Sequence, residues 1–243
     1  MDEPYYRPDL ARVHHEGFAF HADDAAAGVI AFLEPVRDRG GLVVEFGCGS
    51  GLLTKHLVDA GFRVAASDAS PAMLDLAREH VGDAASFSLV ALPDDPLPAA
   101  DAIVGVGHAL SYLPDEAAID RATDAIADAL VPGGLVLFDI CDLAWGEARR
   151  EQGSVGWTGD DWALVTAFST PAPDRYVREM TIFTRNDDGS WRRDEERHDN
   201  VLVDTSLLPA RLAARGVDVV IEMSIGEYDL PTGLVAVRGT KRA

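Results

Sequence analysis

Three glycines, Gly47, Gly49 and Gly51, alternate with other residues directly after the apolar run 42–46. Such a run is typical of a strand buried on both faces, and a helical pattern begins near Leu52. Glycines at this position let the backbone turn tightly and approach a ligand that a Cβ atom would push away. The helix that follows offers unpaired N–H groups to that ligand. The pattern predicts a ligand-binding turn; a strand-to-helix turn that binds nothing is the alternative.

Two carboxylates accompany this turn. Glu45 lies just before it, and Asp68 follows Gly47 by 21 residues, at the end of a second strand-like stretch, 62–68. This separation suits a carboxylate at the tip of the neighbouring parallel strand, where it can accept hydrogen bonds from both hydroxyls of a ribose. An aspartate after a strand can also be only a turn or cap residue. Together with the glycines, Asp68 favours ribose binding.

Histidine is the side chain best suited to act as a base near neutral pH. Of the seven histidines, His108 ranks first because it follows the buried stretch 101–106 at a strand's carboxyl end. His14 and His15 rank next, and His198 follows them; each could instead be a surface or structural histidine. Histidines and phenylalanines are also concentrated within 14–21, which predicts either a lid over a pocket or a segment that caps the sheet.

Strand and helix patterns alternate along the first part of the chain. Strands are predicted at 42–46, 62–68, 86–90, 101–106 and 135–140, with helices at 22–36, 52–60, from Pro71 onward and at 115–130. Pro132-Gly133-Gly134 is expected to end the last of these helices. Five alternations predict an α/β fold with a doubly wound, mostly parallel sheet, whose ligands bind at the carboxyl ends of the strands.

The pattern changes after the fifth strand. The stretch 153–204 has no helical period and contains strand patterns at 162–169, 176–185 and 191–203. We expect an antiparallel insertion whose aromatic residues roof a substrate pocket or form a homodimer surface. A helix at 205–215 and an antiparallel pair, 217–225 and 234–239, complete the sheet. The predicted organisation is a lid or helical segment at 1–40, an α/β core at 41–142 and 205–243, and an insertion at 143–204.

Composition limits the classes of partner. A formal charge of −20 over 243 residues argues against a nucleic-acid or anionic-membrane surface and favours a small-molecule substrate. No apolar run approaches the roughly 20 residues that span a bilayer, and no signal peptide is evident. Cys48 and Cys141 lack metal-ligand spacing, so we expect reduced thiols, no metal site and a cytoplasmic location.

The chain resembles the class I S-adenosylmethionine-dependent methyltransferases over nearly its whole length. The resemblance rests on Glu45-x-Gly47-x-Gly49-x-Gly51, on Asp68, on Leu130-x-Pro132-Gly133-Gly134 and on the terminal strand pair. It implies a seven-stranded Rossmann-like sheet that binds S-adenosylmethionine. It also implies that the insertion covers the acceptor site, as in small-molecule, sugar and natural-product members, where a methyl group is transferred to O or N.

Site residues follow from the same resemblance. Gly47, Gly49 and Gly51 would line the methionine part of the cofactor, Glu45 would organise the turn and the amino group, and Asp68 would bind the ribose. The full set of expected cofactor contacts is Tyr6, Glu45, Gly47, Cys48, Gly49, Gly51, Asp68, Ala69, Met73, Ala91, Leu92, Gly107 and His108. The chain departs from the family pattern in one respect, because no acid follows the third strand to bind the adenine. Ala91 and Leu92 would lie beside the adenine instead.

Two other functions are compatible with part of the pattern. One is an S-adenosylmethionine-binding protein that does not methylate, such as a cyclase or a regulatory subunit. The other is an NAD-dependent oxidoreductase, which the glycine spacing disfavours because Leu52 occupies the place of the third glycine in Gly-x-Gly-x-x-Gly.

Overall fold

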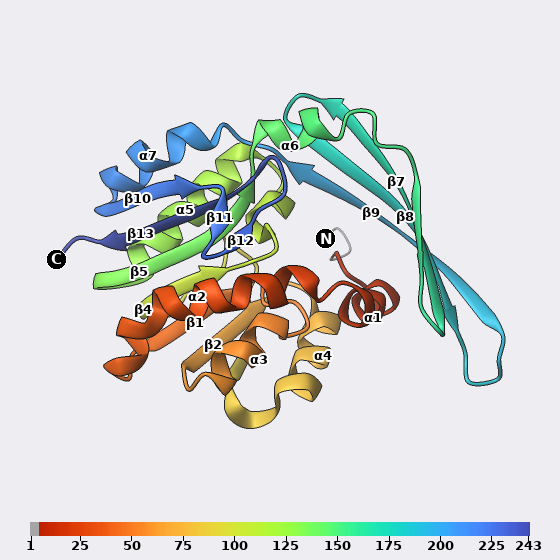
Figure 1. Ribbon diagram of the computed structural model, residues 1–243, viewed down its shortest axis with the longest axis horizontal. Helices are drawn as coiled ribbons and strands as arrows, with labels where there is room; N and C mark the ends of the chain where they lie inside the picture. Colours follow the sequence, from red (N-terminus) through yellow and green to blue (C-terminus); the bar gives the residue numbers. More distant parts are fainter. Residues whose placement is uncertain (1–4) are drawn as a thin grey trace.

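In the computed structural model, which describes residues 5–243 apart from the side chain of Ala84, a seven-stranded sheet has the order β10-β13-β5-β4-β1-β2-β3 (Figure 1). Its strands are β1 (Leu42–Phe46), β2 (Arg63–Asp68), β3 (Ser86–Leu89), β4 (Ala100–Gly105), β5 (Leu130–Cys141), β10 (Val217–Glu222) and β13 (Leu234–Lys241). Strand β13 pairs antiparallel with β10 and β5, and the other pairings in this sheet are parallel. The predicted doubly wound, mostly parallel sheet is confirmed.

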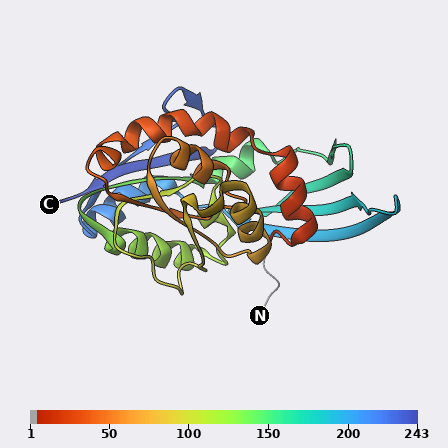
Figure 2. The same ribbon diagram turned by 90° about the horizontal axis from the view of Figure 1, so that it is seen from below.

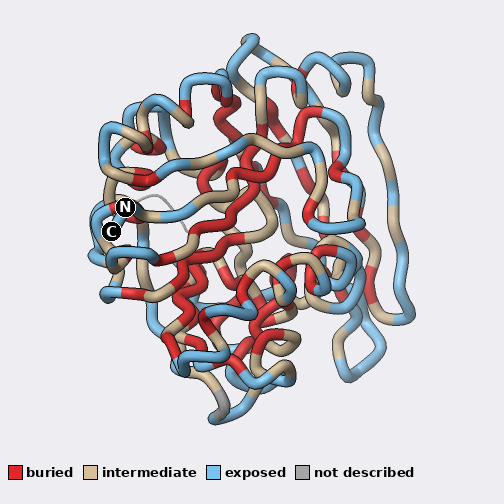
Figure 3. The backbone as a smooth tube through the Cα atoms, turned by 60° about the vertical axis from the view of Figure 1, so that its left-hand side comes forward, coloured by how far each residue is buried: buried red, intermediate tan, exposed pale blue. Residues whose placement is uncertain are grey.

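Helices cover both faces of this sheet (Figure 2). On one face, α2 (Phe20–Asp38), α3 (Leu52–Asp59) and α4 (Pro71–Val81) bury residues such as Leu33, Leu57 and Leu74 against the strands. On the other, α5 (Glu116–Ala129) and α7 (Leu208–Ala214) bury Ile126 and Leu212 in a second core. An apolar layer on each face explains why the central strands consist mostly of buried residues, drawn in red in Figure 3.

Local sequence explains where the helices near the site begin. The hydroxyl of Ser70 accepts a hydrogen bond from the backbone nitrogen of Met73, and Pro71 occupies the first helical position of α4. Asp115 caps α5 in the same way, through the backbone nitrogen of Ala118. These caps fix the loops that follow β2 and β4 at the edge of the sheet where the strands end.

A second, four-stranded antiparallel sheet follows β5. It consists of β6 (Val155–Thr158), β7 (Trp162–Ala172), β8 (Arg175–Arg185) and β9 (Trp191–Val201), and the helix α6 (Leu143–Ala148) precedes it. Its long strands extend beyond the central sheet, and α1 (Pro8–Gly17) lies against them (Figure 1). Leu10 and Val13 of α1 pack on Trp162, Met180 and Ile182 in a small third core. The N-terminal segment and the insertion therefore pack together around one shared apolar core.

Several expected boundaries were wrong. Strand β5 begins at Leu130, which pairs with Ala100, and Pro132-Gly133-Gly134 forms a bulge within the strand instead of a break before it. Gly133 adopts a φ of +75°, which lets the chain loop out and resume pairing at Leu135.

The C-terminal part and the N-terminal segment also differ from expectation. Residues 217–225 are not one strand, because β10 ends at Glu222 and a small hairpin of β11 (Ser224–Ile225) and β12 (Tyr228–Asp229) follows. The helix expected at 205–215 is a 3₁₀ turn (Thr205–Leu207) followed by α7. Helix α1 was not predicted. No helix among residues 5–243 is long and apolar enough to cross a membrane.

Candidate active site

The glycine turn between β1 and α3 requires left-handed backbone at all three glycines. Gly47, Gly49 and Gly51 have φ values of +60°, +54° and +80°, a region that other residues rarely adopt. The backbone nitrogen of Gly49 donates a hydrogen bond of 2.8 Å to Oδ2 of Asp68, and the backbone nitrogen of Cys48 donates to the carbonyl of Ser67. The turn is thus fixed to the end of the neighbouring strand β2.

The space available for a side chain differs from one glycine of the site to the next. A Cβ atom added at Gly47 would lie 2.4 Å from Cβ of Ala109, so this glycine serves packing. A Cβ at Gly49 would meet only Sδ of Met73, at 3.9 Å, and one at Gly107 would meet nothing within 4 Å. Gly49 and Gly107 therefore leave backbone open to a ligand, which is the property that a nucleoside cofactor needs at this place.

Asp68 retains acceptor capacity in this arrangement. Its Oδ1 accepts a hydrogen bond of 2.8 Å from the backbone nitrogen of Ser70, and its Oδ2 accepts the bond from Gly49. Burial raises the pKa of Asp68 above its usual range, while these two amides oppose the shift. Each carboxylate oxygen has two lone pairs, so one on each oxygen can still accept a hydroxyl.

Glu45 is almost fully buried at the base of the turn. Its Oε2 accepts a hydrogen bond of 2.7 Å from the hydroxyl of Thr54 on α3. Burial raises the pKa of Glu45 to about 8, although the Thr54 bond acts in the opposite direction. A carboxyl group at this depth favours a cationic partner, because a nearby positive charge would offset the cost of ionising it.

A cavity of about 280 Å³ lies beside Gly107 and His108, between the central sheet, the N-terminal helices and the insertion. Aromatic and apolar side chains form most of its wall. Its lining is Tyr6, Leu10, His14, Phe18, Phe20, His21, Gly107, His108, Trp145, Trp157, Leu164, Thr166, Phe168, Arg178, Met180, Pro231 and Leu234. A cavity of this kind can hold a small molecule and exclude water from it.

His108 and His14 both line the cavity, and Nδ1 of each ring is buried with no hydrogen-bond partner among the described residues. Burial, followed by the nearby charge of Arg178, lowers the pKa of His108 to about 3 and that of His14 to about 4. Both rings are therefore neutral at physiological pH. In the tautomer that leaves Nδ1 unprotonated, this nitrogen can accept a hydrogen bond from an acceptor molecule, and the low pKa makes either ring a weak base.

Asp139, near the end of β5, fixes the backbone before His108. Its Oδ1 accepts hydrogen bonds from the backbone nitrogens of Gly107 (2.9 Å) and His108 (2.6 Å). Burial opposes its ionisation, but hydrogen bonds from His21 and from the Gly107 backbone hold the pKa of Asp139 below its usual range. His108 has a φ of +48°, which this carboxylate helps to maintain.

The structure places the other two ranked histidines away from the cavity. Nδ1 of His15 lies 2.9 Å from the hydroxyl of Ser50, over the glycine turn. The side chain of His198 has an exposed fraction of 0% and hydrogen-bonds to Glu196, so no acceptor molecule can reach it in this structure. Burial beneath the N-terminal segment is the reason, and the position of His198 at the end of a predicted strand did not reveal it.

His21 lines the cavity although it was not among the ranked bases. Its Nε2 lies 2.6 Å from Oδ2 of Asp139, and its Nδ1 lies 2.9 Å from the hydroxyl of Tyr228. The concentration of histidines and aromatics in 14–21 was the only sequence signal for it. Its pairing with a carboxylate 118 residues away depends on the tertiary structure.

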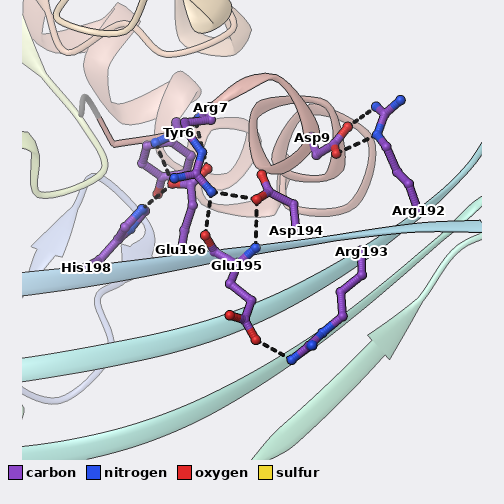
Figure 4. Close-up of polar contacts among 9 residues, drawn as sticks. All are labelled: Tyr6, Arg7, Asp9, Arg192, Arg193, Asp194, Glu195, Glu196 and His198. Carbon is purple, nitrogen blue, oxygen red and sulfur yellow. Dashed lines mark hydrogen bonds and ion pairs between the residues drawn. The ribbon is translucent and has the colours of Figure 1, made fainter.

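Tyr6 joins the cofactor side of the site to the cavity. Its carbonyl accepts a hydrogen bond from the hydroxyl of Ser70, next to Asp68, and its own hydroxyl lies 2.7 Å from that of Tyr112. Figure 4 shows that Glu196 holds the backbone nitrogens of Tyr6 and Arg7 from the side of β9. The N-terminal segment is thus attached both to the loop after β2 and to the insertion.

The remaining expected contacts differ in exposure. Cys48 and Met73 are buried around the turn, whereas Ala69 and Ala91 are exposed. Leu92 packs partly on the second core. The backbone nitrogen of Ala91 donates to Asp95, so this loop carries a carboxylate, three residues beyond Leu92. None of these positions tests the predicted adenine contact.

Comparison with known proteins identifies the central part of the chain. Residues 43–134 match a family described as "Methyltransferase domain". These residues form a methyltransferase domain. The domain contains the glycine turn, Asp68 and the loop of Gly107 and His108 described above, and the resemblance to class I S-adenosylmethionine-dependent methyltransferases is confirmed.

Relatives and solved structures agree with this assignment. An uncharacterized methyltransferase of Geobacillus thermodenitrificans is 34% identical over 142 residues, which cover 56% of this chain and 64% of that protein. A ubiquinone biosynthesis O-methyltransferase of Idiomarina loihiensis is 33% identical over 116 residues, 45% of this chain and 46% of that protein. The chain thus spans less than two thirds of the length of these curated relatives.

The methyltransferase domain and its insertion together match solved structures over nearly their full length. The sugar N-methyltransferase KedS8 from Streptoalloteichus sp. has a TM-score of 0.78 and 20% identity, with 100% of this chain and 97% of that chain covered. DesVI from Streptomyces venezuelae has a TM-score of 0.78 and 20% identity, with 98% and 100% covered. At this identity the likeness establishes the Rossmann-like methyltransferase fold, insertion included.

Proposed function

We propose that this chain binds S-adenosylmethionine and transfers its methyl group to an oxygen or nitrogen atom of a small molecule. The observation that carries the proposal is the Gly49–Asp68 hydrogen bond, which joins an open glycine turn to a carboxylate with free acceptor sites, beside an aromatic cavity. Gly49 and Asp68 both lie within residues 43–134, which match the methyltransferase family.

The residues around the turn fit the cofactor that this fold accepts. In the proposed arrangement Gly47, Cys48, Gly49 and Gly51 line the methionine part, and Glu45 organises the turn and faces the amino group. Asp68 accepts the ribose hydroxyls through its free lone pairs. Ala69, Met73, Ala91 and Leu92 surround the adenine. Tyr6, Gly107 and His108 lie between the cofactor and the acceptor.

When bound, S-adenosylmethionine supplies a methyl group on a positively charged sulfur, which the acceptor atom displaces. The chain contributes positioning and exclusion of water, because the cavity wall is mostly aromatic and apolar. If the acceptor atom carries a proton, a neutral His108 or His14 can take it through Nδ1.

Two observations support a small molecule as the acceptor. The insertion contributes Trp157 and Phe168 to the cavity wall, which favours a cover over the acceptor more than a homodimer surface. Structural neighbours include a sugar N-methyltransferase and an amino pentose methyltransferase, and one sequence relative is a ubiquinone biosynthesis O-methyltransferase. We therefore propose a sugar or another natural product as the acceptor.

The two buried free thiols, Cys48 and Cys141, suit a cytoplasmic location.

Calorimetric titration with S-adenosylhomocysteine tests the cofactor. Wild type should bind it with micromolar affinity, and Asp68→Ala should weaken binding by about 1.5–3 kcal/mol, the scale of a hydrogen bond to a charged group. Asp75→Ala, an exposed position on α4, is the matched control. Absence of binding to wild type, or binding of NADH in its place, would contradict the proposal. Methyl transfer from labelled cofactor to a panel of amino sugars and phenols then tests the reaction.

A further inference from the structure

Arg178, in the first half of β8, lines the cavity, yet its charge has no carboxylate partner among the described residues. Nη2 donates a hydrogen bond to the hydroxyl of Tyr112 and lies 3.5 Å from Nδ1 of His198. Nε is buried and has no hydrogen-bond partner, and Nη1 has none among the described residues. The carboxylate of Glu196 joins this network only through the His198 ring.

This situation is unlike that of arginines elsewhere in the insertion. On the neighbouring strand, Arg192 pairs with Asp9, and Arg197 pairs with Glu179 and Asp199. The chain has a net charge of −20, so carboxylates are abundant, and yet none of those in residues 5–243 is placed beside the guanidinium of Arg178 in the cavity wall. An arginine is charged at all physiological pH values, and burying it without a counter-ion is costly.

The charge of Arg178 acts inside the cavity. After burial, it is the largest cause of the lowered pKa of His108, at about 3, and of His14, at about 4. Both of these rings line the same cavity as the guanidinium. Asp139 opposes this effect at His108, but no described carboxylate pairs with Arg178 itself, so an anionic ligand beside the guanidinium would be stabilised there.

We propose that Arg178 binds an anionic group of the acceptor, a carboxylate or a phosphoryl group, within the cavity. The proposal rests on the proposed function, because it places that anion on the acceptor next to His108. A guanidinium presents N–H donors in a planar fork that matches the paired oxygens of either group. Trp145 and Phe168 line the same cavity, so they would contact an apolar or cyclic body attached to the anion.

A purely structural role is the alternative. The hydrogen bond from Arg178 to Tyr112 could serve only to hold the Tyr112–Tyr6 pair in place. In that case Arg178 would stabilise the folded chain and would have no preference for anions. The two roles predict opposite results for ligand binding and for thermal unfolding.

Calorimetric titration distinguishes them. Protein saturated with S-adenosylhomocysteine is titrated with benzoate, phenyl phosphate and neutral benzamide. Wild type should bind at least one anion 10-fold or more tightly than benzamide, and the better of the two identifies the group. Arg178→Met should remove this preference, Arg178→Lys should retain part of it, and Arg197→Met, an exposed control, should match wild type. Equal binding of the anions and benzamide by wild type, or an unchanged preference in Arg178→Met, would overturn the proposal.

Thermal unfolding without cofactor supplies a second measurement. Benzoate or phenyl phosphate should raise the midpoint of wild type and leave that of Arg178→Met unchanged, and the substitution itself should not lower the midpoint. A lower midpoint in Arg178→Met combined with no anion effect on wild type would overturn the proposal. The two proposals can also fail separately. If wild type does not bind S-adenosylhomocysteine but still binds anions through Arg178, the proposed function is contradicted and the anion site is supported.

Discussion

Oε2 of Glu196, on strand β9 of the insertion, accepts a hydrogen bond of 2.9 Å from the backbone nitrogen of Tyr6, just before α1 (Figure 4). Oε1 of the same carboxylate accepts a bond of 2.7 Å from the backbone nitrogen of Arg7. The carbonyl of Tyr6 in turn accepts from Ser70, beside Asp68. The insertion thereby positions the segment that lies next to the proposed cofactor site.

Weakening this attachment should reduce cofactor affinity. Glu196→Gln removes one of two charged acceptors, and we expect S-adenosylhomocysteine to bind about 5- to 30-fold more weakly, equivalent to about 1–2 kcal/mol. Hydrogen exchange of amides 6–17 should become faster. Glu195→Gln is the control, because that side chain pairs with Arg193 on the exposed face. Equal effects of the two substitutions would show that the attachment does not influence cofactor binding.

Stability should fall with rising pH because of Glu45. The carboxyl group has a pKa of about 8 in the folded chain and an ordinary value near 4.5 when unfolded. Between these values the folded chain holds the extra proton, so the free energy of unfolding decreases as pH rises and levels off above about 8. The loss should be on the order of 3–5 kcal/mol.

Urea unfolding from pH 5 to pH 9 measures this dependence. Glu45→Gln, which keeps an acceptor for Thr54, should have a smaller slope, and the difference between the two slopes should be largest between about pH 5.5 and pH 7, where the folded chain holds the proton and the unfolded chain has lost it. Glu196, whose pKa burial raises to about 7, contributes in the same direction in both proteins below that pH. An identical slope in wild type and Glu45→Gln would refute the assignment.

Two glycine substitutions should separate folding from cofactor binding. Gly47→Ala places a Cβ 2.4 Å from Ala109 at a φ of +60°, and we expect a loss of about 2–4 kcal/mol of stability. Gly49→Ala has room in the protein, so it should cost only about 1–2 kcal/mol of backbone strain. It should nevertheless weaken S-adenosylhomocysteine binding by more than 10-fold, because the methyl group enters the space proposed for the cofactor. Unchanged affinity in a folded Gly49→Ala protein would show that the cofactor does not bind beside Gly49.

The cavity histidines should stay neutral down to low pH. With pKa values of about 3 and 4, His108 and His14 should show no ring titration in heteronuclear NMR between pH 8 and pH 5.5. Once an acceptor is known, His108→Gln should lower kcat by about 10²-fold or more if His108 is the base. A His108 titration midpoint near 6.5 would contradict the buried, neutral ring described above.

Short stretches of sequence, each read by itself, determined much of the central fold. The apolar run before Gly47, the Ser70-Pro71 cap and the spacing to Asp68 each depend on neighbours within one strand–turn–helix unit, where side-chain period and glycine conformation suffice. These features were predicted correctly at the level of the elements. The Gly49–Asp68 contact follows from them, because adjacent parallel strands must end side by side.

Tertiary structure alone decided the acceptor side of the site. His21 meets Asp139 across 118 residues, and Tyr6 meets Glu196 across 190, so no local period or spacing encodes either pair. The same holds for Arg178: its place on β8 predicts a strand residue, but only the packing of the insertion against α1 and the central sheet brings its charge into the cavity. Burial is a property of the assembled layers, which is why His198 ranked as a base by position and yet lies out of reach beneath them.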